Sequence, residues 1–280
     1  MISTNWGVAT DTGLVRHENQ DAYLAQMPVF VVADGMGGHA SGALASRLAI
    51  EELGPLAANG LRPTVEDVAR AIDAANGRVL AEASAVPGNE GMGTTVVGLT
   101  LVADRDQEVW LVFNVGDSRL YRLWDGSLSQ VTVDHSEVQE LVDAGTITAE
   151  AARVHPERNV ITRAVGVGTE LAPDFWLRPP EPGERFLLAS DGLTVDVSDE
   201  DIRGVLDGEP DPSVAATRLV ERAVAAGGHD NVTVIVVDVI AGATTAVDVD
   251  EPARGRPARL GVMNGNEPRG PDGDPKGTRR

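Results

Sequence analysis

The stretch Val29-Phe30-Val31-Val32-Ala33-Asp34-Gly35-Met36-Gly37-Gly38-His39 is the most informative part of the chain. Its apolar, mostly β-branched residues predict a buried strand, and Asp34 stands where that strand is expected to end. A second stretch, Phe186-Leu187-Leu188-Ala189-Ser190-Asp191-Gly192-Leu193, has the same order. Each predicts a carboxylate at the rim of a sheet, followed by a glycine that lets the backbone turn tightly and bring its carbonyl near a ligand.

Similar apolar runs predict further strands, and amphipathic runs predict helices. The expected strands are 28–33, 94–102, 108–115, 119–124, 184–189 and 232–240, and the expected helices are 41–56, 64–85, 136–144, 198–206 and 212–226. Two long helices follow the first strand, and three strands then follow closely, with hairpin-like turns at Asp104-Arg105-Asp106 and at Gly116. This order favours antiparallel sheets over regular βαβ alternation and predicts an α+β layered sandwich.

The composition changes near residue 240. Residues 241–280 are rich in Gly, Pro, Arg and Asp and poor in large apolar residues, so we expect a folded domain over 1–240 and a disordered polar tail over 241–280. The start of the chain has no secretion leader, and no segment reaches the run of about 18 apolar residues that a membrane helix needs. The sequence therefore predicts a cytoplasmic protein without a membrane partner.

Composition also excludes several classes of function. The formal net charge is −20, and such a chain repels nucleic-acid phosphates, so we expect no nucleic-acid binding. Because cysteine is absent, a cysteine nucleophile is excluded. The only lysine is Lys276, in the tail, whereas P-loop and kinase chemistry need a lysine inside the fold.

Two more carboxylates lie next to predicted strands, Asp117 after Gly116 and Asp230 before the last strand. Taken singly, such positions are ordinary turn sequences. Together with Asp34 and Asp191 they predict a site for Mg²⁺ or Mn²⁺, which prefer oxygen ligands and retain waters. Arg16 taken alone is a solvated turn residue, but beside such a site its guanidinium would bind phosphate oxygens with two hydrogen bonds.

In this order, these segments resemble the metal-dependent protein phosphatase family, also called protein phosphatase 2C. The matching motifs are Arg16-His17-Glu18-Asn19-Gln20-Asp21, Val32-Ala33-Asp34-Gly35-Met36-Gly37-Gly38-His39, Gly91-Met92-Gly93-Thr94-Thr95, Val115-Gly116-Asp117-Ser118-Arg119, Asp134-His135-Ser136, Ser190-Asp191-Gly192-Leu193 and His229-Asp230-Asn231-Val232-Thr233. The resemblance implies a four-layer α-β-β-α sandwich of two antiparallel sheets flanked by helices. It also implies a mobile flap at about residues 135–166 that contacts substrate.

The same resemblance implies a protein serine/threonine phosphatase that hydrolyses phosphoserine and phosphothreonine. A metal-bridging hydroxide in a binuclear Mn²⁺ or Mg²⁺ site would attack phosphorus without a phosphoenzyme intermediate. Asp34 would bridge the two ions, Asp191 and Asp230 would complete the first site, and the carbonyl of Gly35 would serve the second. Arg16 would hold the substrate phosphate.

Outside these ligands, the resemblance implies outer-shell roles for Asp21 and Asn231. The substrates of such an enzyme would be phosphorylated proteins, the products of serine/threonine kinases. We expect the enzyme to be a monomer. Members that bind a third metal usually carry an Asp four residues after the one that corresponds to Asp191, and here that residue is Val195. Asp196 follows, but an offset of one residue points its side chain elsewhere.

The sequence therefore predicts two metals per chain and a third, at Asp117, that is weak or absent. Two further departures concern the same motifs. Gln20 replaces a glutamate, and Met36 stands where animal members place a histidine proposed as the general acid. His39 is a candidate proton donor, although a structural role in the loop is the simpler interpretation.

Two alternatives stay open. Gln20 and Val195 would also fit a catalytically weak or dead binding module that keeps the fold. The motifs also do not distinguish a general protein phosphatase from one that acts on a small phosphoester or on one regulatory partner, such as an anti-sigma-factor antagonist.

Overall fold

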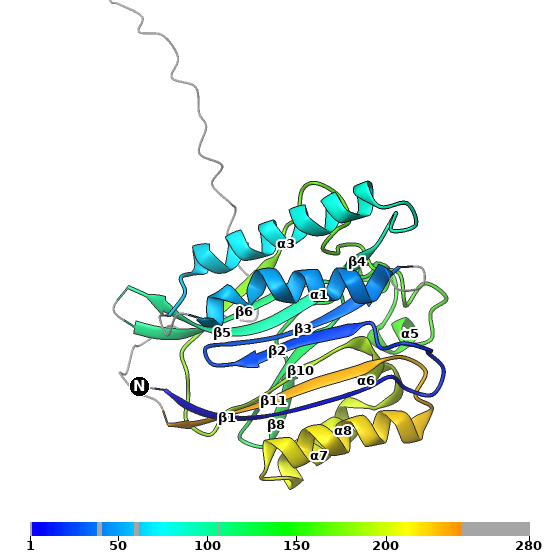
Figure 1. Cartoon of the computed structure of the whole chain (residues 1–280). Helices are drawn as coiled ribbons and strands as arrows, with labels where there is room; N and C mark the ends of the chain where they lie inside the picture. The colour runs from blue at the N-terminus through cyan, green and yellow to red at the C-terminus, as the bar shows by residue number, and fades with distance from the viewer. Residues whose placement is uncertain (1, 38–40, 59–61, 106, 242–280) are drawn as a thin grey trace, which may run out of the picture.

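Two β-sheets lie face to face, with helices on the outer side of each (Figure 1), in a computed structural model that describes residues 2–37, 41–58, 62–105 and 107–241. One sheet has the order β1 (Ser3–Asp11), β11 (Val232–Ala241), β10 (Arg185–Ala189), β7 (Arg119–Trp124), β8 (Ser127–Gln130). The other has the order β2 (Asp21–Gln26), β3 (Val29–Met36), β5 (Val96–Asp104), β6 (Gln107–Val115), β9 (Asp174–Arg178), with β4 (Gly93–Thr94) paired to β3. Each of these strand pairs is antiparallel.

The helices complete the four layers. The sheet that contains β3 is covered by α1 (Ser41–Leu53), α2 (Pro55–Ala58) and α3 (Val65–Ala85). The sheet that contains β11 is covered by α6 (Asp191–Asp196), α7 (Asp199–Gly208) and α8 (Pro212–Ala226). Between β8 and β9 lie the short helices α4 (Glu137–Asp143) and α5 (Ala149–Ala152). The expected α-β-β-α sandwich is therefore confirmed.

Strand β10 shows why the central strands appear in the sequence as continuous apolar runs. Phe186 and Leu188 face the interior between the two sheets, whereas Leu187 and Ala189 face the helices outside. Both faces are buried, so the usual alternation of apolar and polar residues disappears. The strand then ends at the edge where Asp191 begins α6.

Several expected boundaries differ from the structure. The expected helix 41–56 is two helices separated at Gly54, and the expected strand 94–102 is interrupted at Thr95. The turn at Gly116 is not a hairpin, because β6 and β7 belong to different sheets and the chain crosses between them there. Gly116 makes this crossing with φ 112°, a backbone conformation that favours glycine.

Four strands were not predicted, namely β1, β2, β8 and β9. His39 and the tail beyond Ala241 lie outside the described residues. In the described part of the chain, no helix combines the length and the apolar character needed to cross a membrane.

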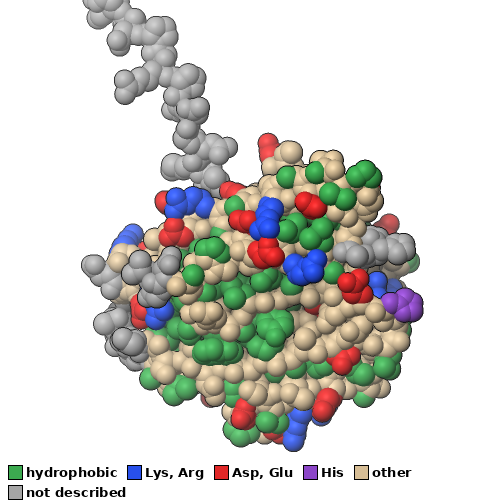
Figure 2. Space-filling model, viewed as in Figure 1, with side chains coloured by type: hydrophobic (Ala, Val, Ile, Leu, Met, Phe, Trp, Pro, Cys, Tyr) green, Lys and Arg blue, Asp and Glu red, His purple; other side chains and the backbone are tan. Residues whose placement is uncertain are grey.

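The edge strands β1 and β2 lie on the same side of the sandwich. Figure 2 shows that hydrophobic side chains gather on this face, over the two strands. Here the Trp6 ring packs edge-to-face on Phe30 with 5.4 Å between the ring centroids. This contact helps to close the interior along the side where neither sheet has a further strand.

Candidate active site

Asp21 and Asp34 lie opposite each other on β2 and β3. Cross-strand partners place their side chains on the same face of a sheet, so the two carboxylates are neighbours. The amide of Asp34 donates to Thr95 Oγ1 (3.0 Å), which in turn lies 2.7 Å from Ser118 Oγ. Asp21 Oδ2 accepts a hydrogen bond of 2.9 Å from Ser190 Oγ. Groups from both sheets therefore fix this pair.

The other predicted carboxylates converge on the same place. Burial raises the pKa of Asp34 well above its ordinary value, and the negative charges of Asp21, Asp191, Asp117 and Asp230 raise it further. The pKa of Asp21 is raised to about 7 and that of Asp117 to about 8, in both cases chiefly by burial. Burial and the charge of Asp230 also raise the pKa of Asp191. We call these five residues the acidic cluster.

The acidic cluster has features that suit a bound cation. Two buried oxygens, Asp21 Oδ1 and Asp191 Oδ1, have no hydrogen-bond partner, which is costly for a polar atom unless another group satisfies it. Divalent cations, or the waters that they retain, would satisfy such oxygens and offset the repulsion between the carboxylates. In the described part of the chain no group of three or more Asp, Glu or His side chains is placed to hold a metal ion by itself, so waters or backbone oxygens would complete the coordination.

Gly35 contributes to the cluster through its lack of a side chain. A Cβ atom there would lie 2.2 Å from the carbonyl oxygen of Gly42 and 2.6 Å from that of Gln20. The expected tight turn after Asp34 is wrong, because β3 continues to Met36. The glycine is instead required where the start of α1 and the residue before β2 approach the backbone of β3.

Arg16 lies at the mouth of the acidic cluster. Its Nη2 donates to Asp230 Oδ2 at 2.6 Å, and its side chain is 52% exposed. The hydrogen bond to Asp230 raises the pKa of Arg16, and the charges of Asp191 and Asp34 add to this effect. A charged guanidinium with exposed donors next to buried carboxylates can bind a phosphate group that approaches the cluster.

Asn231 holds the loop that carries Arg16. Its Oδ1 accepts from the amide of Gln20 (2.8 Å), and its Nδ2 donates to the carbonyls of Thr12 and Glu18 (2.9 Å each). Asn231 is buried, so these bonds are shielded from water. The expected outer-shell residue thus contacts the arginine loop, whereas the contact between Ser190 and Asp21 was not predicted.

The hydrogen bonds between His135 and Gly116 are a second contact that the sequence did not reveal. This buried side chain accepts a hydrogen bond from the amide of Gly116 at Nδ1 (3.1 Å), while its own amide donates to the carbonyl of Gly116 (2.9 Å). Its Nε2 lies 3.3 Å from Asp174 Oδ2 and 3.0 Å from Arg163 Nη1. His135 therefore fixes the turn that carries Asp117. Its only sequence signal was its place in the Asp134-His135-Ser136 motif.

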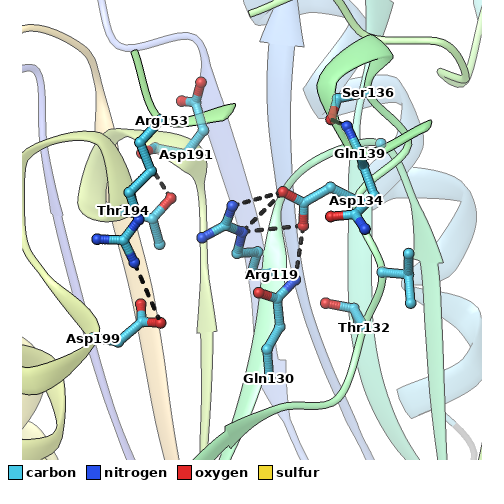
Figure 3. Close-up of polar contacts among 12 residues, drawn as sticks. Arg119, Gln130, Thr132, Asp134, Ser136, Gln139, Arg153, Asp191, Thr194 and Asp199 are labelled. Carbon is cyan, nitrogen blue, oxygen red and sulfur yellow. Dashed lines mark hydrogen bonds and ion pairs between the residues drawn. The ribbon is translucent and has the colours of Figure 1, made fainter. Parts of the chain in front are cut away.

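A groove of about 530 Å³ extends from Asp117 and Asp191 to the segment that contains α4 and α5. Arg119 and Asp134 form an ion pair in it (2.7 Å), and Arg153, which follows α5, reaches Asp199 at the start of α7 (3.8 Å; Figure 3). The apolar part of its lining includes Val138, Val142 and Val195. The groove is therefore a space beside the acidic cluster with both polar and apolar side chains in its lining.

Val195 lies one helical turn after Asp191, is 51% exposed and lines this groove. The carboxylate of Asp196 instead binds His229, with 2.7 Å between Asp196 Oδ1 and His229 Nδ1. That Asp196 does not replace the missing carboxylate stays a prediction.

Comparison with known proteins gives one family. A model of the family described as "Protein phosphatase 2C" matches residues 15–225, more than half of the chain. A serine/threonine protein phosphatase, PstP, of Mycobacterium tuberculosis is 42% identical over 84% of this chain and 45% of its own length. The serine/threonine phosphatase stp of Listeria welshimeri is 35% identical over 82% of this chain and 93% of its own length.

A solved structure gives the same result. It is that of the catalytic domain of PstP in complex with two manganese ions, with a TM-score of 0.79, 38% identity and coverage of 86% of this chain and all of that one. The present chain thus spans about half the length of the mycobacterial protein and nearly all of the Listeria protein.

Proposed function

This chain belongs to the protein phosphatase 2C family, and we propose that it hydrolyses phosphoserine and phosphothreonine in proteins. The observation that carries the proposal is the acidic cluster, with the half-exposed guanidinium of Arg16 at its mouth. Such a site attracts divalent cations with its carboxylates and a phosphate group with its arginine.

In this proposal two Mn²⁺ or Mg²⁺ ions bind per chain. Asp34 would contact both, Asp191 and Asp230 would complete the first site, and the carbonyl of Gly35 would serve the second. When bound, the cations neutralise phosphate charge and lower the pKa of coordinated water. The orphaned Asp191 Oδ1 and the two manganese ions of the PstP structure support this assignment. A third ion at Asp117 is weak or absent, since Val195 supplies no oxygen.

The side chains of the protein have separate tasks around the reacting phosphate. Arg16 binds phosphate oxygens with its exposed nitrogens, and its bond to Asp230 sets the direction of the guanidinium. Asp21 stays an outer carboxylate that Ser190 orients. The groove beside Asp117 and Asp191 receives the polypeptide that flanks the phosphorylated residue.

The proposal extends to the rest of the molecule. Residues 1–240 form the catalytic domain, and about 135–166 form its flap. The substrates are products of serine/threonine kinases, and the enzyme acts in the cytoplasm as a monomer, without nucleic-acid or membrane partners. The names of the relatives favour this proposal over a catalytically dead binding module.

Phosphate release from synthetic peptides tests the proposal. We expect release from phosphothreonine and phosphoserine peptides with millimolar Mn²⁺, none with a chelator, and little from a phosphotyrosine peptide of the same sequence. A native protein that is inactive on all of the peptides at every metal concentration would instead support the binding module.

A further inference from the structure

A short contact joins the two elements that carry Asp191 and Asp230. Asp191 begins α6 and Asp196 ends it, while His229 directly precedes Asp230. The carboxylate of Asp196 makes two contacts with the loop that carries His229 and Asp230. Its Oδ1 lies 2.7 Å from His229 Nδ1, and its Oδ2 accepts from the amide of His229 at 3.2 Å. A carboxylate only accepts, so Nδ1 of His229 carries the proton.

The Asp196 side chain is 6% exposed, whereas that of His229 is 64% exposed. The imidazole lies over Gly227, where a Cβ atom would approach it to 2.2 Å. A residue with a side chain at position 227 would therefore displace the His229 ring from its contact with Asp196.

The same two elements touch at the other end of α6. A Cβ atom on Gly192 would lie 2.0 Å from the carbonyl oxygen of Asn231, so helix and loop are in backbone contact there. Asp191 and Asp230 each lie beside this contact. Together, the contact at Gly192 and the bonds of Asp196 fix α6 at both of its ends relative to the loop.

This double attachment matters because Asp191 and Asp230 carry like charges. The negative charge of Asp230 raises the pKa of Asp191, and the same repulsion favours separation of the two carboxylates. A cation that binds between them needs both oxygens in place, and the free energy of binding is reduced if it must first bring them together. A rigid link between their backbones would remove that cost.

We propose that Asp196 and His229 are positioning residues that hold Asp191 and Asp230 at the separation a divalent cation requires. The inference rests on the proposed function, because the cation is the one assigned to that site. In this proposal Asp196 does not bind the metal but positions the residues that do. The proposal also explains why a carboxylate suits this position, since only a carboxylate can accept at both oxygens.

Mn²⁺ binding by the full chain, measured calorimetrically, tests the proposal without relying on turnover. Loss of an outer-shell partner typically lowers metal affinity by about 10–100-fold. His229→Ala should therefore raise the dissociation constant for Mn²⁺ about tenfold. His229→Asn, whose amide can donate from a similar place, should stay within about threefold of the native protein.

Asp196→Asn keeps one of the two accepting oxygens, so its dissociation constant should lie between those of the native protein and His229→Ala. His229 is largely exposed, so its truncation leaves no buried cavity and the variant should fold. Arg222→Ala is the matched control, because it breaks an ion pair of 3.2 Å between α8 and Asp201 of α7 that does not touch the acidic cluster.

Unfolding temperatures measured in chelator separate positioning from simple stability. The proposal predicts that Arg222→Ala binds Mn²⁺ like the native protein, and that His229→Ala binds it weakly even where the two variants unfold at similar temperatures. Unchanged Mn²⁺ affinity in His229→Ala, or an equal loss in Arg222→Ala, would overturn it. A native protein that binds no Mn²⁺ would instead overturn the proposed function.

Discussion

Asp21 and Asp34 are direct cross-strand partners on β2 and β3, and both have a pKa far above the ordinary value of 3.8. Like charges opposite each other on a sheet destabilise it. A bound cation would offset the repulsion between these two carboxylates, so cation binding explains why they lie opposite each other.

The first prediction concerns pH. A carboxyl group whose pKa is raised on folding binds more protons in the folded state, so stability increases as pH falls from the folded value toward the unfolded one. In chelator, the free energy of unfolding should rise between pH 8 and pH 6, because Asp117 (about 8) and Asp21 (about 7) take up protons there. Urea unfolding at the two pH values measures the change.

A variant separates this effect from the general reduction of negative charge. Asp117→Asn should reduce the increase, whereas Asp207→Asn, an exposed position in α7, should leave it unchanged. Equal pH dependence in the native protein and in Asp117→Asn would show that Asp117 does not titrate in this range.

The second prediction concerns Arg16. Hydrogen bonds to a charged group contribute about 1.5–3 kcal/mol, so Arg16→Ala should lower kcat/KM on a phosphothreonine peptide by roughly 10–100-fold. Arg16→Lys should recover only part of this loss, because an ammonium group cannot form the planar pair of bonds. Steady-state kinetics at saturating Mn²⁺ give the comparison. If Arg16→Ala retained native kcat/KM, phosphate would not bind there.

The third prediction concerns the number of metals. Val195 and Asp191 lie four residues apart in α6 and therefore on one side of it, and both line the groove next to Asp117. Titration should show two Mn²⁺ per native chain and a third in Val195→Asp. Val214→Asp, at an exposed position of α8, should show two. Three tightly bound ions in the native chain would contradict the account.

The fourth prediction concerns Gly35. Gly35→Ala places a Cβ atom 2.2 Å from the backbone of Gly42, which cannot move without displacing α1. We expect a loss of at least about 3 kcal/mol in the free energy of unfolding. Gly77→Ala, in open space inside α3, should raise stability by about 0.5–1 kcal/mol instead. Similar unfolding curves for the two variants would mean that this contact is not tight.

The sequence predicted those parts of the fold in which a local pattern is decisive. Strands buried on both faces, such as β10 and β11, appear as apolar runs, and helices such as α3 and α8 appear as amphipathic runs. Strands β1 and β2 were missed because they lie at sheet edges, where polar and small residues interrupt the pattern. The sequence around Gly116 has the pattern of a hairpin turn, because only packing shows that its two strands lie in different sheets.

The same limit applies to the site. The family motifs predicted that Asp34, Asp191 and Asp230 belong to one metal site. The opposition of Asp21 and Asp34 depends on the register of β2, a strand that was not predicted. The contacts of His135 and Asp196 join segments far apart in the chain, and no local pattern indicates which long-range partner a buried polar side chain finds.

The most direct test of the central claim is phosphate release from a phosphothreonine peptide by the native protein and by Asp34→Asn, both with saturating Mn²⁺. The substitution removes the negative charge of the carboxylate proposed to contact both ions while keeping its size. We expect a fall in rate of at least about a hundredfold with the fold intact, because positioning and charge at such a site contribute several kcal/mol. A variant that retains near-native activity would contradict it.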